Sequence, residues 1–207
     1  MFYPFKGLYS NKEPVNFIPN VFDHLGKDQF FIGCFQSYKY FEEYRELILQ
    51  EFNFSMKSLS EKTKELADVI NRCESVCIHV RRGDYLNGYY YELLGKVCNK
   101  DYYKRAVEII KENVNNPCFF VFSDDLDYVK ANLKMENAVS VSFNRYNDSW
   151  QDMYLMSICK HNIIANSTFS WWGAWLNKNP NKIVVAPNRW FADKTDDEII
   201  PTGWLRI

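Results

Sequence analysis

Residues 76–85 combine an apolar run with two arginines, a glycine and an aspartate, a pattern typical of a buried strand that ends at an anion site. The apolar half suits a strand covered on both faces. Arg81 and Arg82 carry planar guanidinium groups, which bind phosphate through parallel hydrogen bonds. Gly83 would let the backbone turn close to a ligand, and Asp84 places an acid beside the cations. The segment could therefore bind phosphate.

Spacing alone leaves two interpretations of this segment open, and the first is the phosphate site. Successive side chains of a strand point to opposite faces, so Arg81 shares a face with His79, and Arg82 shares one with Val80. This alternation predicts different roles for the two arginines. The other interpretation is a surface ion pair between arginine and Asp84, a common contact that adds little to stability.

Two further polar clusters follow predicted strands. Ser123, Asp124 and Asp125 come directly after the apolar run 118–122, and residues 166–170 read Asn-Ser-Thr-Phe-Ser before a predicted helix. In open α/β sheets ligands bind beyond the carboxyl ends of the strands, where such clusters meet. Hydroxyl groups and free N–H groups at a helix N-terminus favour an anion. The three clusters together predict one ligand site.

Each cluster also has a purely structural explanation. Ser123 or Asp124, and likewise Ser170, are typical helix N-caps. Ser149 would cap the helix at 149–160, and Asp152 suits a capping carboxylate at its third position. Beside an arginine site for phosphate, however, these acids suggest a nucleotide. A carboxylate can accept both N1–H and the exocyclic amine of guanine, so a guanine nucleotide would explain acids near a phosphate site.

The elements that must position these clusters alternate along the chain. Strands are predicted at 76–81, 118–122, 138–142, 161–165 and 183–186, with helices at 101–114, 125–133, 149–160 and 170–178. This alternation predicts an α/β fold, a parallel sheet with helices on both faces. Before it, residues 1–30 are predicted to be loop, and amphipathic helices are predicted at 39–51 and 58–71. Ser58 and Glu61 would form a capping box for the second helix.

The composition of the chain and the motifs that it lacks disfavour several classes of protein. The chain has 207 residues with 25 Lys+Arg against 26 Asp+Glu, a balance that disfavours a nucleic-acid partner. It has neither a Gly-x-Gly-x-x-Gly nor a Walker A sequence, which disfavours dinucleotide dehydrogenases and P-loop NTPases. No His/Cys cluster suggests a metal site. No apolar run approaches the roughly 20 residues of a transmembrane segment. We expect a cytoplasmic location, with peripheral association at the inner face of the membrane left open.

Four segments of the chain resemble glycosyltransferase family 11, the α-1,2-fucosyltransferases, especially its bacterial members. These segments are 33–41, 79–85, 122–125, and 152–157 leading into 165–176. The resemblance implies a GT-B-like architecture. In this chain, residues 1–73 would be the remnant of an acceptor-side domain and residues 74–207 a Rossmann-like donor domain.

The resemblance also implies the reaction and its partners. The reaction would be inverting transfer of L-fucose from GDP-fucose to the 2-hydroxyl of a galactose-containing glycan acceptor. The resemblance implies no cofactor and no essential metal, and it gives GDP-fucose and the glycan as partners.

Carried onto this chain, the family's phosphate contacts fall on the first and third clusters. Arg81 would bind the β-phosphate and balance charge as GDP leaves. His79 and Arg82 would shape the same pocket. Ser167 and Thr168 would donate hydroxyl or backbone hydrogen bonds to the diphosphate.

The acidic residues are assigned to the guanosine part of the donor and to the hydroxyl of the acceptor. Asp152 would bind the guanine edge or the ribose, with Asp124 and Asp125 supporting that site. Asp84 is the motif acid near the expected donor carbon and is the candidate base for the acceptor hydroxyl, although it could equally be a structural partner of Arg82.

The chain departs from the family at its N-terminus. The family's initial strand and glycine-rich loop have no counterpart in this sequence, so we expect a complete donor half and a shortened acceptor half. Two functions follow from this: an active fucosyltransferase, or an inactive remnant that binds nucleotide sugar without transferring it. A nucleic-acid module that uses Arg81, Arg82 and the tryptophans is disfavoured by the balanced charge.

Overall fold

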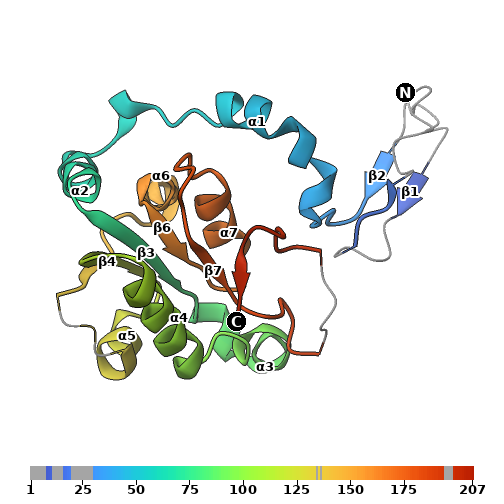
Figure 1. Ribbon diagram of the computed structural model, residues 1–207. Helices are drawn as coiled ribbons and strands as arrows, with labels where there is room; N and C mark the ends of the chain where they lie inside the picture. Colours follow the sequence, from blue (N-terminus) through green and yellow to red (C-terminus); the bar gives the residue numbers. More distant parts are fainter. Residues whose placement is uncertain (1–7, 11–15, 20–29, 134, 136, 194–197) are drawn as a thin grey trace.

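The computed structural model describes residues 8–10, 16–19, 30–133, 135, 137–193 and 198–207 (Figure 1). Its centre is a six-stranded sheet with strand order β5-β4-β3-β6-β7-β8, in which every pair of neighbours is parallel. The strands are β3 (Glu74–Val80), β4 (Pro117–Ser123), β5 (Val139–Val141), β6 (His161–Ile163), β7 (Val184–Ala186) and β8 (Leu205–Arg206). The predicted α/β class with a Rossmann-like parallel sheet is confirmed.

Helices cover both faces of this sheet, as the alternating sequence predicts (Figure 1). On one face lie α4 (Lys100–Asn113) and α5 (Leu126–Leu133), and on the other lie α2 (Glu61–Asn71), α6 (Trp150–Ile158) and α7 (Thr168–Trp175). Val76, Ile78 and Val80 of β3 pack with α4, whereas Cys77 packs with α2 and α6. Because side chains alternate along β3, this packing shows on which face of the sheet each residue at the end of the strand lies.

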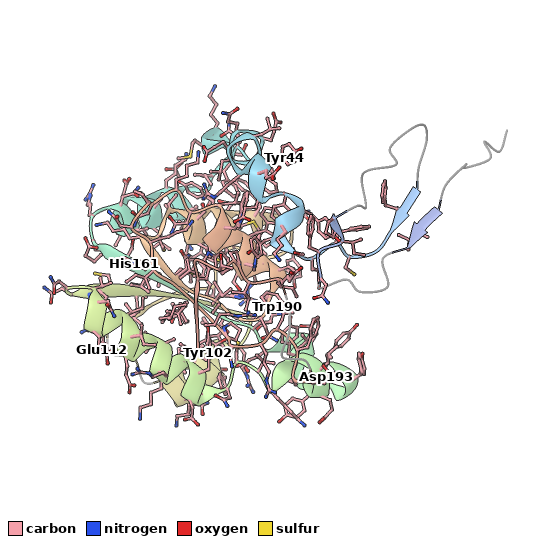
Figure 2. All side chains as sticks on the ribbon, turned by 45° about the vertical axis from the view of Figure 1, so that its right-hand side comes forward. Tyr44, Tyr102, Glu112, His161, Trp190 and Asp193 are labelled. Atoms are coloured by element: carbon pink, nitrogen blue, oxygen red, sulfur yellow. The ribbon has the colours of Figure 1, made fainter. Side chains whose placement is uncertain are left out.

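Side chains from the helices also bond to the strands. Tyr102 of α4 (labelled in Figure 2) donates its hydroxyl to the Ile164 carbonyl at 2.6 Å and to the Val185 carbonyl at 3.2 Å. These bonds satisfy the buried phenol and hold α4 against β6 and β7.

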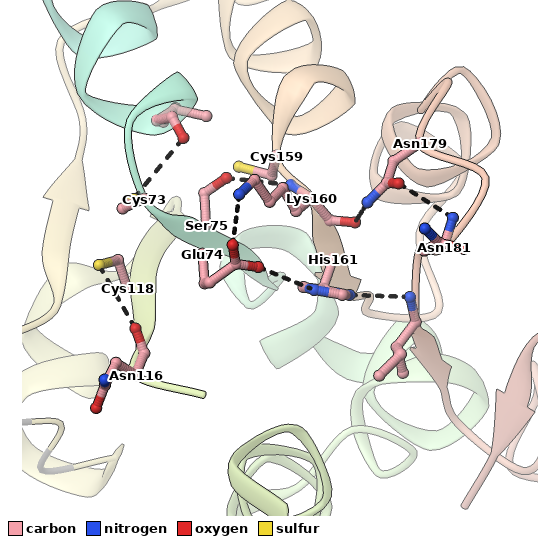
Figure 3. Close-up of polar contacts among 12 residues, drawn as sticks. Cys73, Glu74, Ser75, Asn116, Cys118, Cys159, Lys160, His161, Asn179 and Asn181 are labelled. Carbon is pink, nitrogen blue, oxygen red and sulfur yellow. Dashed lines mark hydrogen bonds and ion pairs between the residues drawn. The ribbon is translucent and has the colours of Figure 1, made fainter. Parts of the chain in front are cut away.

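The amino ends of the central strands are joined by a polar network (Figure 3). Lys160 forms an ion pair with Glu74, and its backbone N–H donates to the Ser75 hydroxyl at 3.1 Å. The backbone N–H of Ile183 donates to Nδ1 of His161 at 3.0 Å. Side chains thus join the strands at this edge. The three polar clusters lie at the opposite edge, where the strands have their carboxyl ends.

The first thirty residues contain a strand, contrary to the prediction of loop. β1 (Leu8–Ser10) pairs in parallel with β2 (Phe30–Ile32) as a two-stranded sheet of its own. Prolines in this stretch favour loop locally, but strand pairing with a segment about twenty residues away is a tertiary effect that local pattern does not reveal. The predicted loop positions 1–7, 11–15 and 20–29 lie outside the described residues.

The two predicted amphipathic helices are present with different starts. Residues 39–51 form two 3₁₀ turns followed by α1 (Arg45–Glu51). The cap of α2 is Ser60, whose hydroxyl accepts from the Thr63 N–H at 3.2 Å, so the predicted Ser58 capping box is wrong. The apolar side chains of α2 pack into the same core as β3 and β4. The domain boundary at residues 73 and 74 stays a prediction.

A segment of short helices follows β3, where the sequence pattern predicts no element. It comprises a 3₁₀ helix (Gly83–Leu86), α3 (Gly88–Tyr90) and a π-helical turn (Tyr91–Gly95). A Cβ at Gly95 would lie 2.2 Å from the Tyr85 carbonyl oxygen, so only glycine permits this close approach.

Gly173 of α7 also allows a close approach of α6, because a Cβ there would lie 2.8 Å from the Cβ of Met156. We expect Gly173→Ala to lower the free energy of unfolding by about 1–3 kcal/mol, since backbone must move to relieve the contact. Urea unfolding measures this change. Gly203→Ala is the matched control, because nothing lies within 4 Å of a Cβ built at Gly203. Equal midpoints for the two variants would contradict the packing described here.

No helix in the described ranges is long and apolar enough to cross a membrane.

Candidate functional site

The three polar strand ends surround one cavity of about 1240 Å³. All three predicted clusters contribute to its wall, together with α6 and the loop before it. The predicted site residues that line it are His79, Arg81, Asp84, Asp124, Asp125, Asp152, Ser167 and Thr168. The structure thus brings together eight of the nine residues singled out from the sequence, and Arg82 is the exception.

Arg81 is held in the cavity wall by two carboxylates. Its Nη2 lies 2.7 Å from Oδ1 of Asp84, its Nη1 lies 2.9 Å from Oδ2 of Asp124, and its guanidinium carbon lies 5.8 Å from the centre of the Tyr85 ring. A guanidinium has five N–H donors in a planar fork, so two contacts with carboxylates leave donors for a ligand. These contacts fix the orientation of Arg81 toward the cavity.

Asp84 is therefore the ion-pair partner of Arg81, and the alternative that it pairs with Arg82 is wrong. The same carboxylate lines the cavity. It can thus orient the guanidinium and still face a reacting group.

Arg82 lies beside the cavity and not among the described residues of its wall. Its Nε donates to Oδ2 of Asp125 at 3.2 Å, and its guanidinium carbon lies 3.5 Å from the centre of the Tyr128 ring. Its backbone N–H donates to Oδ1 of Asp124 at 2.9 Å. The alternation along β3 explains this placement, because Arg82 follows Val80 onto the face covered by α4 and α5. Arg82 supports the wall through the two acids.

Asp125 also begins α5, since its Oδ1 accepts from the Tyr128 N–H at 2.9 Å. Asp124 accepts from the Arg82 backbone and pairs with Arg81. A Cβ at Gly83 would lie 2.7 Å from Oδ2 of Asp124, so this glycine lets the aspartate reach both arginines. The carboxylates of Asp124 and Asp125 therefore hold Arg81 and Arg82 in place. Direct contact of these acids with a ligand stays a prediction.

Asp152 points into the cavity from the first turn of α6 and does not cap that helix. Ser149 makes no side-chain capping bond either, so the predicted cap of α6 is wrong. Oδ1 of Asp152 accepts from Nδ2 of Asn144 at 2.8 Å, and no donor to Oδ2 is found among the described residues. Burial raises the pKa of Asp152 to about 6, although the Asn144 hydrogen bond acts in the opposite direction. A half-buried carboxylate with one free oxygen is suited to accept N–H groups from a ligand.

His79 lies almost fully buried in the same wall, with its ring 5.9 Å from that of Phe169. Burial, helped by the charge of Arg81, lowers the pKa of His79 to about 3, so the imidazole is neutral at physiological pH. Its Nδ1 is buried without a hydrogen-bond partner in the part of the chain that the structure describes. Such an unpartnered atom is uncommon among buried polar groups.

The first turn of α7 forms another part of the wall, where Ser167, Thr168 and Phe169 line the cavity. Ser167 is the N-cap residue but makes no side-chain capping bond. The nearby Ser170 hydroxyl is turned inward, because it donates to the carbonyls of Ala165 and Ser167, both at 3.2 Å. The N-terminus of α7 therefore presents its N–H groups and dipole toward the cavity without a capping side chain.

Several wall residues have no clear signal in the sequence. Asn144 is the most informative, because it joins Asp152 to the Thr63 hydroxyl, which donates to its Oδ1 at 3.3 Å. A lone asparagine in a loop carries no periodicity that would mark it. Other wall residues missed from the sequence are Lys130, Ser142, Arg145, Tyr146 and Met156. No group of three or more His, Cys, Asp or Glu that could hold a metal occurs within the described ranges.

Comparison with known proteins identifies a matching family. The family model described as Glycosyl transferase family 11 matches residues 15–207 of this chain.

Curated relatives carry transferase names. An alpha-1,2-colitosyltransferase of Escherichia coli is 39% identical over 184 residues, which are 86% of this chain and 62% of that protein. The O-antigen biosynthesis glycosyltransferase WbnK of Escherichia coli is 34% identical over 84% of this chain and 59% of its own length. Galactoside alpha-(1,2)-fucosyltransferase 1 of Leontopithecus chrysomelas is 28% identical, over 68% of this chain and 40% of its own length. The chain thus spans 62% or less of each of these relatives.

Among solved structures, NodZ alpha-1,6-fucosyltransferase soaked with GDP-fucose is similar, with a TM-score of 0.44 and 15% sequence identity. The match covers 73% of this chain and 53% of that one.

Proposed function

This chain belongs to glycosyltransferase family 11, and from that premise we propose that its cavity binds GDP-fucose and transfers L-fucose to the 2-hydroxyl of a galactoside. The observation that carries the proposal is the arrangement of one cavity. Arg81 and the uncapped start of α7 contribute cationic and N–H groups, and the half-buried Asp152 contributes a free acceptor to the same space. A guanosine diphosphate needs both kinds of group.

The diphosphate would bind at Arg81 and the N-terminus of α7. Arg81 keeps donors free beyond its contacts with Asp84 and Asp124, and the start of the helix supplies the Ser167 hydroxyl and the Thr168 N–H. These groups would stabilise the negative charge that grows on the diphosphate as the sugar leaves.

The guanine base would bind at Asp152. Its carboxylate would accept N1–H and the exocyclic amine, while Asn144 holds it in place through Oδ1. His79 lies in the same wall as a neutral imidazole and would shape the pocket around the nucleotide.

Asp84 would act as the general base for transfer. It would take the proton from the acceptor 2-hydroxyl as that oxygen forms its bond to C1 of fucose. The bond from C1 to the β-phosphate oxygen breaks at the same time, and GDP leaves with the electron pair of that bond. Attack from the side opposite GDP inverts the configuration at C1. In this scheme Arg81 and not a metal balances the charge of the leaving group.

Product analysis tests the proposal. The chain is incubated with a galactoside and either GDP-fucose or the corresponding colitose donor, because a relative of this chain is named a colitosyltransferase. We expect mass spectrometry to show one deoxyhexose added to the 2-position. Donor binding without any transfer, at high protein concentration, would instead identify the chain as a nucleotide-sugar-binding remnant.

Binding of GDP should depend on pH through Asp152. The pKa of about 6 means that the carboxylate is ionised above that pH and accepts both guanine N–H groups. Below it the carboxyl is protonated, so the affinity should fall up to about tenfold per pH unit. Calorimetric titration with GDP between about pH 5 and about pH 7.5 measures this dependence. His79 does not contribute in this range, because its pKa is about 3. The same affinity across the range would exclude Asp152 from guanine binding.

A further inference from the structure

The short helices that follow Asp84 expose three consecutive tyrosines, which we call the tyrosine patch: Tyr89, Tyr90 and Tyr91. Their exposed fractions are 73%, 52% and 42%. The rings of Tyr89 and Tyr90 contact each other edge to face, with centres 5.8 Å apart. Contiguous exposed aromatic residues are uncommon on protein surfaces and mark binding sites.

The patch is exposed because its segment is anchored from the opposite side. The Tyr85 hydroxyl donates to the Asn166 carbonyl at 2.9 Å, and Nδ2 of Asn166 donates to the Leu94 carbonyl at 3.1 Å. The Ala192 N–H donates to the Leu93 carbonyl at 2.8 Å. These bonds join the segment to the loop that precedes α7 and to the chain that follows β7, so the tyrosines are presented by ordered backbone.

The segment that carries the patch begins in the wall of the cavity. Asp84 and Tyr85 line the cavity, and the backbone N–H of Asn87 donates to the Asp84 carbonyl at 3.2 Å. The N–H of Tyr91 donates in turn to the Asn87 carbonyl at 3.2 Å. Two successive turns of backbone therefore lead from the candidate base directly to the tyrosines.

We propose that the tyrosine patch binds the acceptor galactoside by stacking against its apolar face. This inference rests on the proposed function, because it places the acceptor beside Asp84. The axial 4-hydroxyl of a β-galactoside leaves the C–H groups at C3, C4 and C5 together on one face of the sugar. That face matches an aromatic ring, and the phenol hydroxyls can bond to the sugar hydroxyls at its rim. A glucoside lacks this arrangement because its 4-hydroxyl is equatorial.

The size of the patch favours a sugar over a protein partner. Three tyrosines offer a small surface, and a stable protein interface buries about 800 Å² on each partner. The charged neighbours pair with each other, since Lys96 and Glu92 form an ion pair and the Lys96 ammonium lies 5.6 Å from the centre of the Tyr91 ring. An uncharged, partly apolar ligand suits this surface.

Saturation-transfer NMR with GDP present tests the proposal. Methyl β-galactoside should receive saturation at its C3, C4 and C5 protons, and methyl β-glucoside should receive less. In the double variant Tyr89→Ala/Tyr90→Ala the galactoside signal should fall about fivefold or more, while Tyr89→Phe/Tyr90→Phe should keep most of it. Tyr44→Ala is the control, because Tyr44 is 59% exposed and lies far from the segment 83–95 (Figure 2). GDP affinity should be unchanged in all three variants.

Separate outcomes distinguish the two proposals. An undiminished galactoside signal in the double alanine variant, with GDP binding intact, overturns the proposal that the patch binds the galactoside. The proposed donor site is then unaffected. Absence of GDP binding in the folded wild-type chain overturns the proposed function itself. Self-association that the double alanine variant removes, without any galactoside signal in the wild type, assigns the patch to a protein interface and also overturns the proposal.

Discussion

Replacement of Arg81 by alanine should raise the dissociation constant for GDP by about a hundredfold or more. Hydrogen bonds between charged groups are worth about 1.5–3 kcal/mol each, and Arg81 offers the phosphates more than one. The substitution also leaves Asp84 and Asp124 without their cation, at 2.7 Å and 2.9 Å in the wild type, so two carboxylates would then repel the diphosphate. Calorimetry with GDP measures the change.

The repulsion can be separated from the lost contact. Adding Asp84→Asn and Asp124→Asn to Arg81→Ala should restore part of the affinity, because it removes the unpaired charges. Arg105→Ala is the matched control, since Arg105 is an exposed arginine of α4 that pairs with Glu108 and Glu112. The fold should survive, because exposed ion pairs contribute little to stability. A dissociation constant within about threefold of wild type for Arg81→Ala would show that the phosphates bind elsewhere.

Replacement of Asp152 by asparagine should weaken GDP binding about tenfold or more and, at the same time, favour xanthosine diphosphate. Asn144 donates to Oδ1 of Asp152, so the asparagine would keep its oxygen there and turn its amide N–H₂ to the cavity. That donor opposes the amine of guanine but matches the 2-carbonyl of xanthine. Competition between the two nucleotides measures the switch. Equal loss of affinity for both would place the base away from Asp152.

The same substitution should stabilise the folded chain. The pKa of Asp152 rises from an ordinary value near 3.8 to about 6 because of burial, so the folded state holds the proton more tightly than the unfolded state. The protein therefore loses stability as pH rises from about 4 to about 6, and the ionised carboxyl remains unfavourable above that range. Asp152→Asn should recover about 1–2 kcal/mol at neutral pH, since the carboxyl is only partly buried. Thermal unfolding at two pH values measures it.

Much of the site follows from the periodicity of β3 and the order of the strands. The alternation of side chains places His79 and Arg81 on one face and Arg82 on the other, which the structure confirms. Arg82 supports the pocket through Asp124 and Asp125, and its direct contact with a ligand stays a prediction. The parallel order of the strands brings the three clusters to one edge, as the sequence predicts.

The features that the sequence does not predict depend on contacts between residues that lie far apart in the chain. The helices between Gly83 and Gly95 are too short to show a helical period, and they are held by Asn166 from a distant loop. Asn144 is defined by its contact with Asp152 and not by its neighbours in sequence. At α2 two serines stand near the helix start, and the sequence pattern favours the wrong one.

The central claim is that this cavity binds a guanosine diphosphate. Titration calorimetry of the folded wild-type chain with GDP, at about pH 7.5 and with ADP and UDP as controls, tests it most directly. We predict one GDP per chain, much weaker binding of ADP and UDP, and no requirement for an added divalent metal. No heat of GDP binding from a chain shown to be folded, or equal binding of all three nucleotides, would contradict the claim.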